Sequence, residues 1–138
     1  MVSERRVDCV GGIVQDAQGR LLLVLRGQEP AKGTWSLPGG RVEPGESDAV
    51  ATAREVLEET AVPVRVGRLV GTVERAAPGG GVYVIRDYLC APVEPAGGPV
   101  PVWAGDDAAD AAWFTVADLR ALDTSPGLVT ALELWGVL

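Results

Sequence analysis

Three glutamates, Glu55, Glu58 and Glu59, lie close together in the sequence. An α-helix turns about 100° per residue, so Glu58 lies about 60° to one side of Glu55 and Glu59 about 40° to the other. The carboxylates then share one narrow stripe, where like charges cost about 0.2–0.5 kcal/mol per pair. A bound divalent cation would offset this repulsion, because carboxylate oxygens suit magnesium, manganese and calcium. The alternative is an ordinary solvated acidic face of a helix.

The composition limits the chemistry that these carboxylates could share in. The 138-residue chain contains no histidine, which excludes histidine metal ligands, a histidine general base and any Ser-His or Cys-His nucleophile pair. Catalysis would therefore depend on carboxylates, metal and water. The net charge of −7 argues against binding to a nucleic-acid polymer, which needs a basic surface. It leaves small anionic substrates open, because a bound metal can invert the local field.

Length and residue usage predict one domain over residues 1–138. A hydrophobic content of 47% suits a globular domain with its own core. Cys9 and Cys90 match no metal-binding spacing, and each lies in an apolar run that predicts a buried, reduced thiol. We expect neither a secretory signal at the N-terminus nor a membrane span, because no apolar segment has the required place and length. The expected location is therefore the cytoplasm, without a membrane partner.

The glutamate stripe requires a helix that begins near the turn before it. Pro44-Gly45 fits the two central positions of a type II turn, which delivers Glu46 to the start of a helix over residues 47–60. Glu46 or Ser47 is the expected N-cap region, and Pro63 follows the helix end. The expected apolar face consists of three residues spaced 4 and 3 apart, Ala49, Ala53 and Val56.

The remaining elements are mostly strands. Residues 6–14 and 20–26 predict a first hairpin, and residues 64–75 and 81–91 predict a second one. A short strand over residues 111–114 precedes a short helix over residues 115–122. Ser125 and Pro126 are expected to open a last helix that reaches about Trp135. Strands interleaved with few helices predict a mixed sheet in an α/β or α+β layering.

The residues around the stripe resemble the signature of the Nudix hydrolases. The matching positions run from residue 40 to residue 62, namely Gly40, Glu46, Arg54, Glu55, Val56, Glu58, Glu59 and Val62. The one departure is Ala61, which stands where the family has a glycine that ends the helix. The segment Trp35-Ser36-Leu37-Pro38-Gly39-Gly40 also resembles the entry to this box in many members. A solvated acidic face becomes the weaker interpretation once the whole box is considered.

The resemblance implies a fold, a reaction and a set of site residues. The fold would be a Nudix-like α/β/α sandwich with a central mixed sheet. The reaction would be Mg²⁺-dependent hydrolysis of a nucleoside-diphosphate-linked substrate, with Mn²⁺ as a second suitable metal. The resemblance assigns catalysis to five residues, Glu46, Arg54, Glu55, Glu58 and Glu59. It assigns metal binding to Glu55, Glu58, Glu59 and Gly40, with Arg54 orienting the glutamates; an ordinary surface ion pair is the alternative for Arg54.

Further candidates for substrate binding lie outside the helix. They are Arg26, Lys32, Trp35, Gly39, Asp106 and Asp107. Trp35 could stack on a base or pack in the core, and the two cations could hold phosphates or be ordinary surface charge. Asp106, Asp107 and Asp110 could add an acid to the site or form an exposed acidic loop, while Glu74 has a weaker claim. Alternation along a strand puts Tyr83 on the opposite face from Arg86 and Tyr88.

The substrate itself stays open at this stage. The Trp-x-Leu-Pro-Gly-Gly entry resembles mutator-type nucleoside triphosphate pyrophosphatases. Pro78, 16 residues after Val62, resembles a proline of ADP-ribose pyrophosphatases, but a Pro-Gly-Gly-Gly turn also explains it. The alternative function is a ligand-sensing Nudix module that binds a nucleotide or sugar nucleotide, although such modules typically have degraded boxes. An apolar edge strand could pair two chains into a homodimer.

Overall fold

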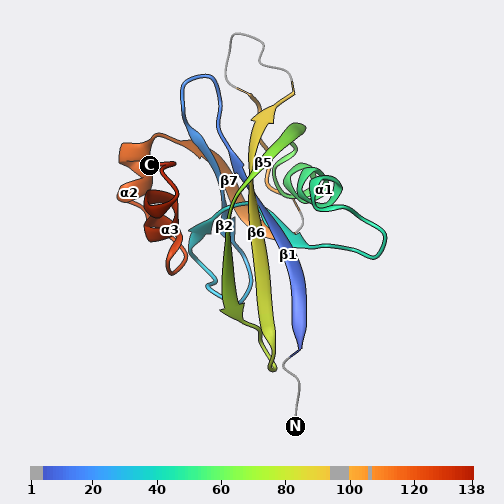
Figure 1. Cartoon of the computed structure of the whole chain (residues 1–138). Coiled ribbons are helices and arrows are strands. Elements are labelled where there is room, and N and C mark those ends of the chain that lie inside the picture. Colours follow the sequence, from blue (N-terminus) through green and yellow to red (C-terminus); the bar gives the residue numbers. More distant parts are fainter. Residues whose placement is uncertain (1–4, 94–99, 106) are drawn as a thin grey trace.

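The computed structural model describes residues 5–93, 100–105 and 107–138 of the chain. Two β-sheets lie at its centre, with helix α1 (Asp48–Thr60) on one side. Helices α2 (Val116–Arg120) and α3 (Leu128–Leu134) lie on the other side, together with the C-terminus (Figure 1). This layering confirms the α/β/α arrangement with a central mixed sheet that the sequence predicts.

The larger sheet has four strands. Their order is β4 (Gly39–Arg41), β1 (Arg6–Val14), β6 (Val82–Pro92) and β5 (Val64–Ala76). Strands β1 and β6 run parallel, whereas the other neighbours run antiparallel, so the sheet is mixed. The antiparallel pairing of β5 with β6 confirms the second predicted hairpin.

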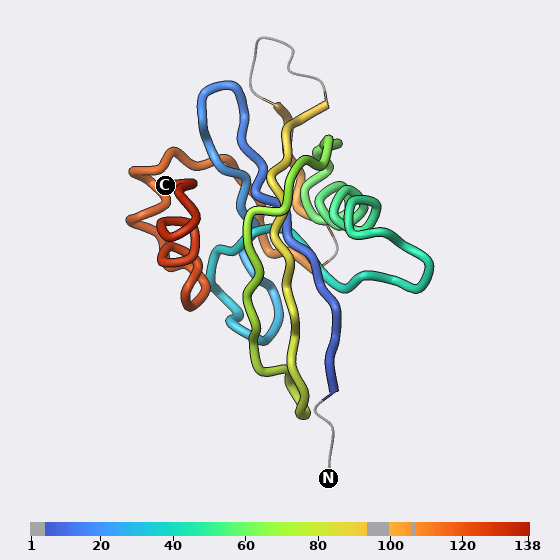
Figure 2. Tube along the Cα trace, in the orientation of Figure 1, coloured from blue at the N-terminus to red at the C-terminus, as the bar shows by residue number. Residues whose placement is uncertain are grey.

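The smaller sheet is antiparallel and corrects one prediction. It contains β3 (Trp35–Ser36), β2 (Leu21–Arg26) and β7 (Ala108–Phe114), in that order. The predicted hairpin of β1 with β2 is wrong, because the only bridge between them in the described chain is the pair Gln15–Leu21. Both edges of each strand are taken by other partners, β4 and β6 for β1, and β3 and β7 for β2. The chain trace accordingly leaves the tight turn toward two different sheets (Figure 2).

Side chains on both faces of the sheets form two hydrophobic cores. Leu21 and Leu23 pack with Leu119 and Leu132 beneath α2 and α3, whereas Leu22, between them in sequence, packs beneath α1. This alternation follows from the period of two in a β-strand. A strand that is apolar on both faces therefore fixes helices on both sides. Among the described residues, no helix combines the length and the apolar content of a membrane crossing.

Helix α1 begins as predicted, but its buried face differs from the expected one. Ser47 is the N-cap, and its hydroxyl accepts a hydrogen bond from the backbone N–H of Val50. The buried side chains are Ala51, Thr52, Val56 and Thr60, and Ala49 is exposed, so its predicted place in the apolar face is wrong. The two threonines can be buried because each hydroxyl donates to a backbone carbonyl four residues earlier.

The first turn of α1 is tied to β6 by a group of polar side chains. The Asp48 carboxylate accepts hydrogen bonds from the Arg86 guanidinium and, at 2.6 Å, from the Tyr88 hydroxyl. The Arg86 guanidinium holds the pKa of Asp48 below its usual range, with Tyr88 contributing. This anchor fixes the direction in which α1 leaves the turn at Pro44-Gly45, where Gly45 has a φ of 83° as the predicted turn requires.

The last helix begins later than predicted. Helix α3 starts at Leu128 after Gly127, whose φ of 82° is incompatible with a continuous helix from Pro126. The Ser125 N–H instead donates to the Trp35 carbonyl, so this segment is held against β3. The proline therefore lies in a turn before the helix rather than in its first turn.

Ala61 ends α1 in the left-handed conformation, with a φ of 62°. Its backbone N–H donates to the Leu57 carbonyl, as in a helix end that normally uses glycine. Replacing Ala61 by glycine removes the steric cost of the Cβ atom, so we expect the free energy of unfolding to rise by about 0.5–1 kcal/mol. Denaturant unfolding measures this change. Ala61→Val, which makes the conformation more costly, should lower stability; equal stability of all three proteins would contradict the assignment.

Candidate functional site

Arg54, in the middle of α1, is the centre of an ion-pair cluster. Its guanidinium donates to both carboxylate oxygens of Glu46, with N–O distances of 2.7 and 2.8 Å. It also donates to Glu55 at 2.8 Å, to Glu58 at 3.3 Å and to the Arg41 carbonyl at 3.1 Å. Arg54 thus contacts three glutamates, Glu46, Glu55 and Glu58. The cluster joins the turn, β4 and the helix in one arrangement.

The Arg54 guanidinium shifts the pKa of its main partner. It holds the pKa of Glu46 at about 2, with a hydrogen bond from the Glu43 backbone N–H contributing. The pKa of Arg54 itself is raised by the same pair. Both groups are thus charged at neutral pH.

Glu55 lies directly against Gly40 in strand β4. A Cβ atom built on Gly40 would come within 2.6 Å of the Glu55 carboxyl carbon. Any larger residue at position 40 would therefore displace the carboxylate. Gly40 therefore brings the backbone of β4 next to the helix carboxylates.

Glu59, one helical turn after Glu55, contacts the same strand, β4. Its carboxylate accepts a hydrogen bond from the Gly39 N–H at 2.9 Å. Burial raises the pKa of Glu59 to about 7, with the Glu55 and Asp107 carboxylates acting in the same direction and the Gly39 N–H and Arg26 opposing them. An acid with this pKa carries a negative charge that the surrounding protein compensates only in part.

Glu55 and Glu59 line a polar cavity of about 270 Å³, here called the carboxylate cavity. Its wall also includes Arg26, Gly39, Gly40 and Asp107. Glu58 is outside the cavity and its side chain is 58% exposed. The three glutamates of the stripe are therefore in two different environments. Within the described parts of the chain, no three acidic side chains converge closely enough to hold a metal ion by themselves.

The structure distributes the other candidate residues between the cavity and its surroundings. Asp107, in the cavity wall, accepts a hydrogen bond from the Gln28 amide at 3.3 Å. Asp110, an exposed residue within β7, accepts one from the Ala111 N–H and does not line the carboxylate cavity. Asp106 lies outside the described residues. Lys32 and Glu74 are exposed, and neither lines the carboxylate cavity.

Trp35 packs against the core rather than lining the carboxylate cavity. Its ring makes an edge-to-face contact with Phe114, with ring centroids 4.8 Å apart. It belongs to the cluster around Leu21 and Leu132. The core-packing alternative that the sequence left open therefore describes its observed contacts.

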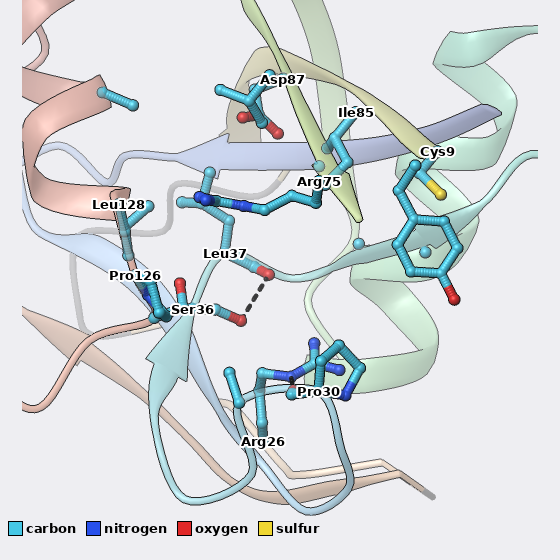
Figure 3. A pocket seen from close by; sticks show the side chains of 18 of the residues that line it. Cys9, Arg26, Pro30, Ser36, Leu37, Arg75, Ile85, Asp87, Pro126 and Leu128 are labelled. Carbon is cyan, nitrogen blue, oxygen red and sulfur yellow. Dashed lines mark hydrogen bonds between the residues drawn. The ribbon is translucent and has the colours of Figure 1, made fainter. Parts of the chain in front are cut away.

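A larger cavity of about 590 Å³, here called the adjoining cavity, meets the carboxylate cavity (Figure 3). The two share Arg26, Glu29, Gly39 and Gly40. The walls of the adjoining cavity come from β1, β4, β5 and β6, from β2, β3 and the loop between them, and from α3 with the turn before it. Such a volume is within the range of small-molecule sites.

Sequence reasoning missed most of this second cavity. Arg41 and Arg75 add positive charge to a wall that already contains Arg26. Tyr83 lines the cavity and its ring lies beneath the Arg41 guanidinium at 5.7 Å, whereas Arg86 and Tyr88 bind Asp48 on the other face. The prediction that Tyr83 faces away from these two residues is confirmed. The buried Asp87 also lines the cavity, and the only sequence signal for it is an acid within an apolar strand.

The family model described as NUDIX domain matches residues 5–133. The chain therefore belongs to the Nudix family, which confirms the resemblance found in the sequence.

Individual relatives and structures agree with this membership. A MutT-like protein of Streptomyces ambofaciens is 40% identical over 77 residues, covering 56% of this chain and 48% of that protein. An ADP-ribose pyrophosphatase of Methanocaldococcus jannaschii is 36% identical over 115 residues, which cover 82% of this chain and 64% of that protein. The crystal structure of a MutT protein from Methanosarcina mazei Go1 has a TM-score of 0.80 at 23% identity, over 99% of this chain and 96% of that one. The last comparison shows the shared fold. This chain spans about half to two thirds of the length of the two curated relatives.

Proposed function

We propose that the protein is a divalent-metal-dependent hydrolase of phosphoric anhydride bonds, acting on a nucleoside-diphosphate-linked substrate. A water oxygen forms a bond to phosphorus, the bridging P–O bond breaks, and the bridging oxygen leaves on the second product as protons pass to water. The main support is that Glu55 and Glu59 meet Gly39 and Gly40 of β4 in a cavity that continues into a larger one. The names of the two curated relatives, MutT-like and ADP-ribose pyrophosphatase, agree with this class of reaction.

The donor set of the carboxylate cavity suits Mg²⁺, with Mn²⁺ as an alternative. Glu55 and Glu59 offer carboxylate oxygens and Gly40 could add its backbone carbonyl, all hard oxygen donors. Glu58 could join through its exposed and rotatable side chain. A protein site with few preassembled ligands fits Mg²⁺, which keeps several waters and bridges carboxylates to substrate phosphates. When bound, such a metal neutralises charge on the phosphates and lowers the pKa of a coordinated water.

The residues of the chain itself have separate roles in this proposal. Arg54 holds Glu46 and Glu55 in fixed orientations by paired hydrogen bonds, so Glu46 acts through Arg54. Glu55, Glu58 and Glu59 supply the negative charge that binds the cation. Arg26, between the two cavities, is placed to bind a phosphate of the substrate.

The nucleoside part of the substrate is assigned to the adjoining cavity. Its wall contains three arginines, Arg26, Arg41 and Arg75, in a chain whose net charge is −7. A local concentration of cations in an acidic protein favours an anionic ligand. Two substrate classes fit, namely a nucleoside triphosphate that yields a monophosphate and pyrophosphate, and ADP-ribose or a nucleotide sugar.

Hydrolysis of a panel of these compounds tests the proposal. The purified protein is mixed with each nucleotide in Mg²⁺ or Mn²⁺, and products are measured by chromatography and by phosphate release after a phosphatase is added. We expect turnover of at least one compound that stops when the metal is chelated. Binding of a nucleotide without turnover in either metal would instead indicate a ligand-sensing module.

Two features of cellular context are also proposals. Cys9 and Cys90 are both buried free thiols, which supports a reducing compartment such as the cytoplasm. Strand β5 is at the edge of the four-stranded sheet and carries the exposed Leu69, which supports pairing of two chains.

A further inference from the structure

Asp87 is a buried carboxyl that the proposed reaction does not use. It lies on β6, its side chain faces the adjoining cavity, and the residue is only 5% exposed. Within the described residues its carboxyl group takes part in no hydrogen bond and no ion pair, although Asp48 on α1 has several partners. Among the described residues, no fully buried side-chain oxygen or nitrogen lacks a hydrogen-bond partner, so the Asp87 oxygens are accessible at the cavity surface, where a ligand can bind them.

The neighbouring strands leave space for this carboxyl. Asp87 pairs with Gly11 on β1 and with Gly71 on β5. A Cβ atom on Gly11 would come within 2.2 Å of the Asp87 Oδ1 atom, and one on Gly71 would come within 2.1 Å of the Trp135 ring. Glycine inside a strand is unfavourable and often marks a close approach. Gly11 thus leaves room for the Asp87 carboxyl, and Gly71 leaves room for the rigid Trp135 ring.

The charge of an ionised Asp87 is only partly compensated by the groups around it. Burial raises the pKa of its carboxyl to about 7, while Arg75 opposes that shift. Figure 3 shows the Arg75 side chain lying between Asp87 and Leu37, in the interior of the cavity. No salt bridge joins Arg75 to Asp87 within the part of the chain that is described. A hydrogen-bond donor from a ligand would complete the surroundings of the carboxyl.

We infer that Asp87 accepts a hydrogen bond from the exocyclic amino group of the nucleobase and thereby selects bases that carry one. An amino group donates to a carboxyl oxygen in either protonation state of the acid. The ionised carboxylate has acceptors alone, so a base with a carbonyl at that position would face it with a second acceptor and lose the bond. This inference rests on the proposed function for its placement of the phosphates. Arg26, which borders both cavities, and Asp87 lie at opposite ends of the view in Figure 3, as a base and its phosphates would require.

Binding of nucleoside monophosphates tests the inference without any turnover, because these compounds contain no anhydride bond. Calorimetry at pH 8, above the pKa of about 7 of the Asp87 carboxyl, measures the Kd of AMP, IMP, CMP and UMP with the wild-type protein and Mg²⁺. We expect AMP to bind about 10-fold or more tightly than IMP, and CMP more tightly than UMP, since a site built for a donor rejects an analogue lacking it.

Two variants assign that preference to Asp87. Asp87→Leu, similar in size and apolar, should bring the AMP-to-IMP ratio of affinities close to about one. Asp87→Asn keeps an acceptor and adds a donor, so it should shift the ratio toward IMP and remains informative if the leucine variant does not fold. Asp118→Asn, the same change on the exposed face of α2, is the matched control and should leave the ratio at the wild-type value.

The outcomes separate this inference from the proposed function. Equal binding of AMP and IMP by the wild type, or an unchanged ratio in both Asp87 variants, overturns the role of Asp87, even if the nucleotide panel shows hydrolysis. A ratio that follows Asp87 supports the inference. If the same protein then hydrolyses no member of the panel, the proposed hydrolase activity is the part that fails.

Discussion

Glu59→Gln should lower kcat by about two to four orders of magnitude, since an uncharged amide replaces one of the carboxylates that would hold the metal. The glutamine oxygen can still accept the hydrogen bond from the Gly39 N–H. The substitution therefore removes the negative charge while the hydrogen bond to Gly39 of β4 remains. The measurement is steady-state hydrolysis of the substrate that the panel identifies, at saturating metal.

The fold should survive this substitution, and its stability gives an independent check. Because burial raises the pKa of Glu59 to about 7 in the metal-free protein, the ionised form is disfavoured by folding. The contribution of Glu59 to the free energy of unfolding of the wild type is largest below the pKa that Glu59 has in the unfolded chain. It falls as the pH rises from that value toward about 7, whereas glutamine does not titrate and shows no such loss. Metal-free Glu59→Gln should therefore unfold at the same temperature as the wild type or higher at pH 8.

A matched control is Glu133→Gln, the same change at a half-exposed residue of α3 that pairs with Arg120 of α2. It should leave kcat unchanged, because Glu133 is absent from the walls of both cavities. Wild-type activity in Glu59→Gln would sink the assignment of the helix carboxylates to the metal site. A fall in kcat accompanied by loss of the folded state would reassign Glu59 to a structural role.

Arg54→Lys should raise the metal concentration needed for half-maximal activity by about 10- to 100-fold, because residues that orient metal ligands typically have effects of this size. The guanidinium binds Glu46 through two nitrogens and Glu55 through a third. A single ammonium group cannot reproduce that geometry, although it keeps the charge. Activity at saturating metal should fall less than the apparent metal affinity.

The control for this variant is Arg65→Lys, on the exposed side of β5. Its Mg²⁺ titration should match that of the wild type. An unshifted titration in Arg54→Lys would mean that the Arg54 cluster is a surface ion-pair group with little influence on the carboxylates. A shift in kcat alone, at unchanged metal affinity, would instead place Arg54 in contact with the substrate.

Helix α1 shows how much local sequence can specify. The Ser47 cap, the type II turn with Gly45 and the glutamate spacing each depend on a few consecutive residues, so all could be predicted. The rotation of the helix could not, because it depends on what packs beneath it. Burial of Thr52 and Thr60 directs Glu55 and Glu59 to the glycines of β4 and leaves Glu58 exposed. One stripe in the sequence thus becomes two different surroundings.

The strands show the limit of the same reasoning. Local patterns predicted β1 and β2 in nearly their observed bounds, but not their partners. Hydrogen-bond pairing joins β1 with β4 and β6, and β2 with β3 and β7, across long stretches of chain. Trp35 likewise fitted both base stacking and core packing until the position of Phe114 was known.

By itself, the sequence determined that this chain is a Nudix protein in which two glycines precede a helix with a stripe of glutamates. It could do so because these residues lie within a few positions of one another in the chain. Tertiary structure decided which two glutamates face the cavity, how Arg54 reaches Glu46, and that a second cavity adjoins the first. Asp87 became a candidate only when β1, β5 and β6 were placed side by side with Gly11 and Gly71 as its neighbours. The physical reason is that burial and cavity shape arise from long-range packing, which no local pattern contains.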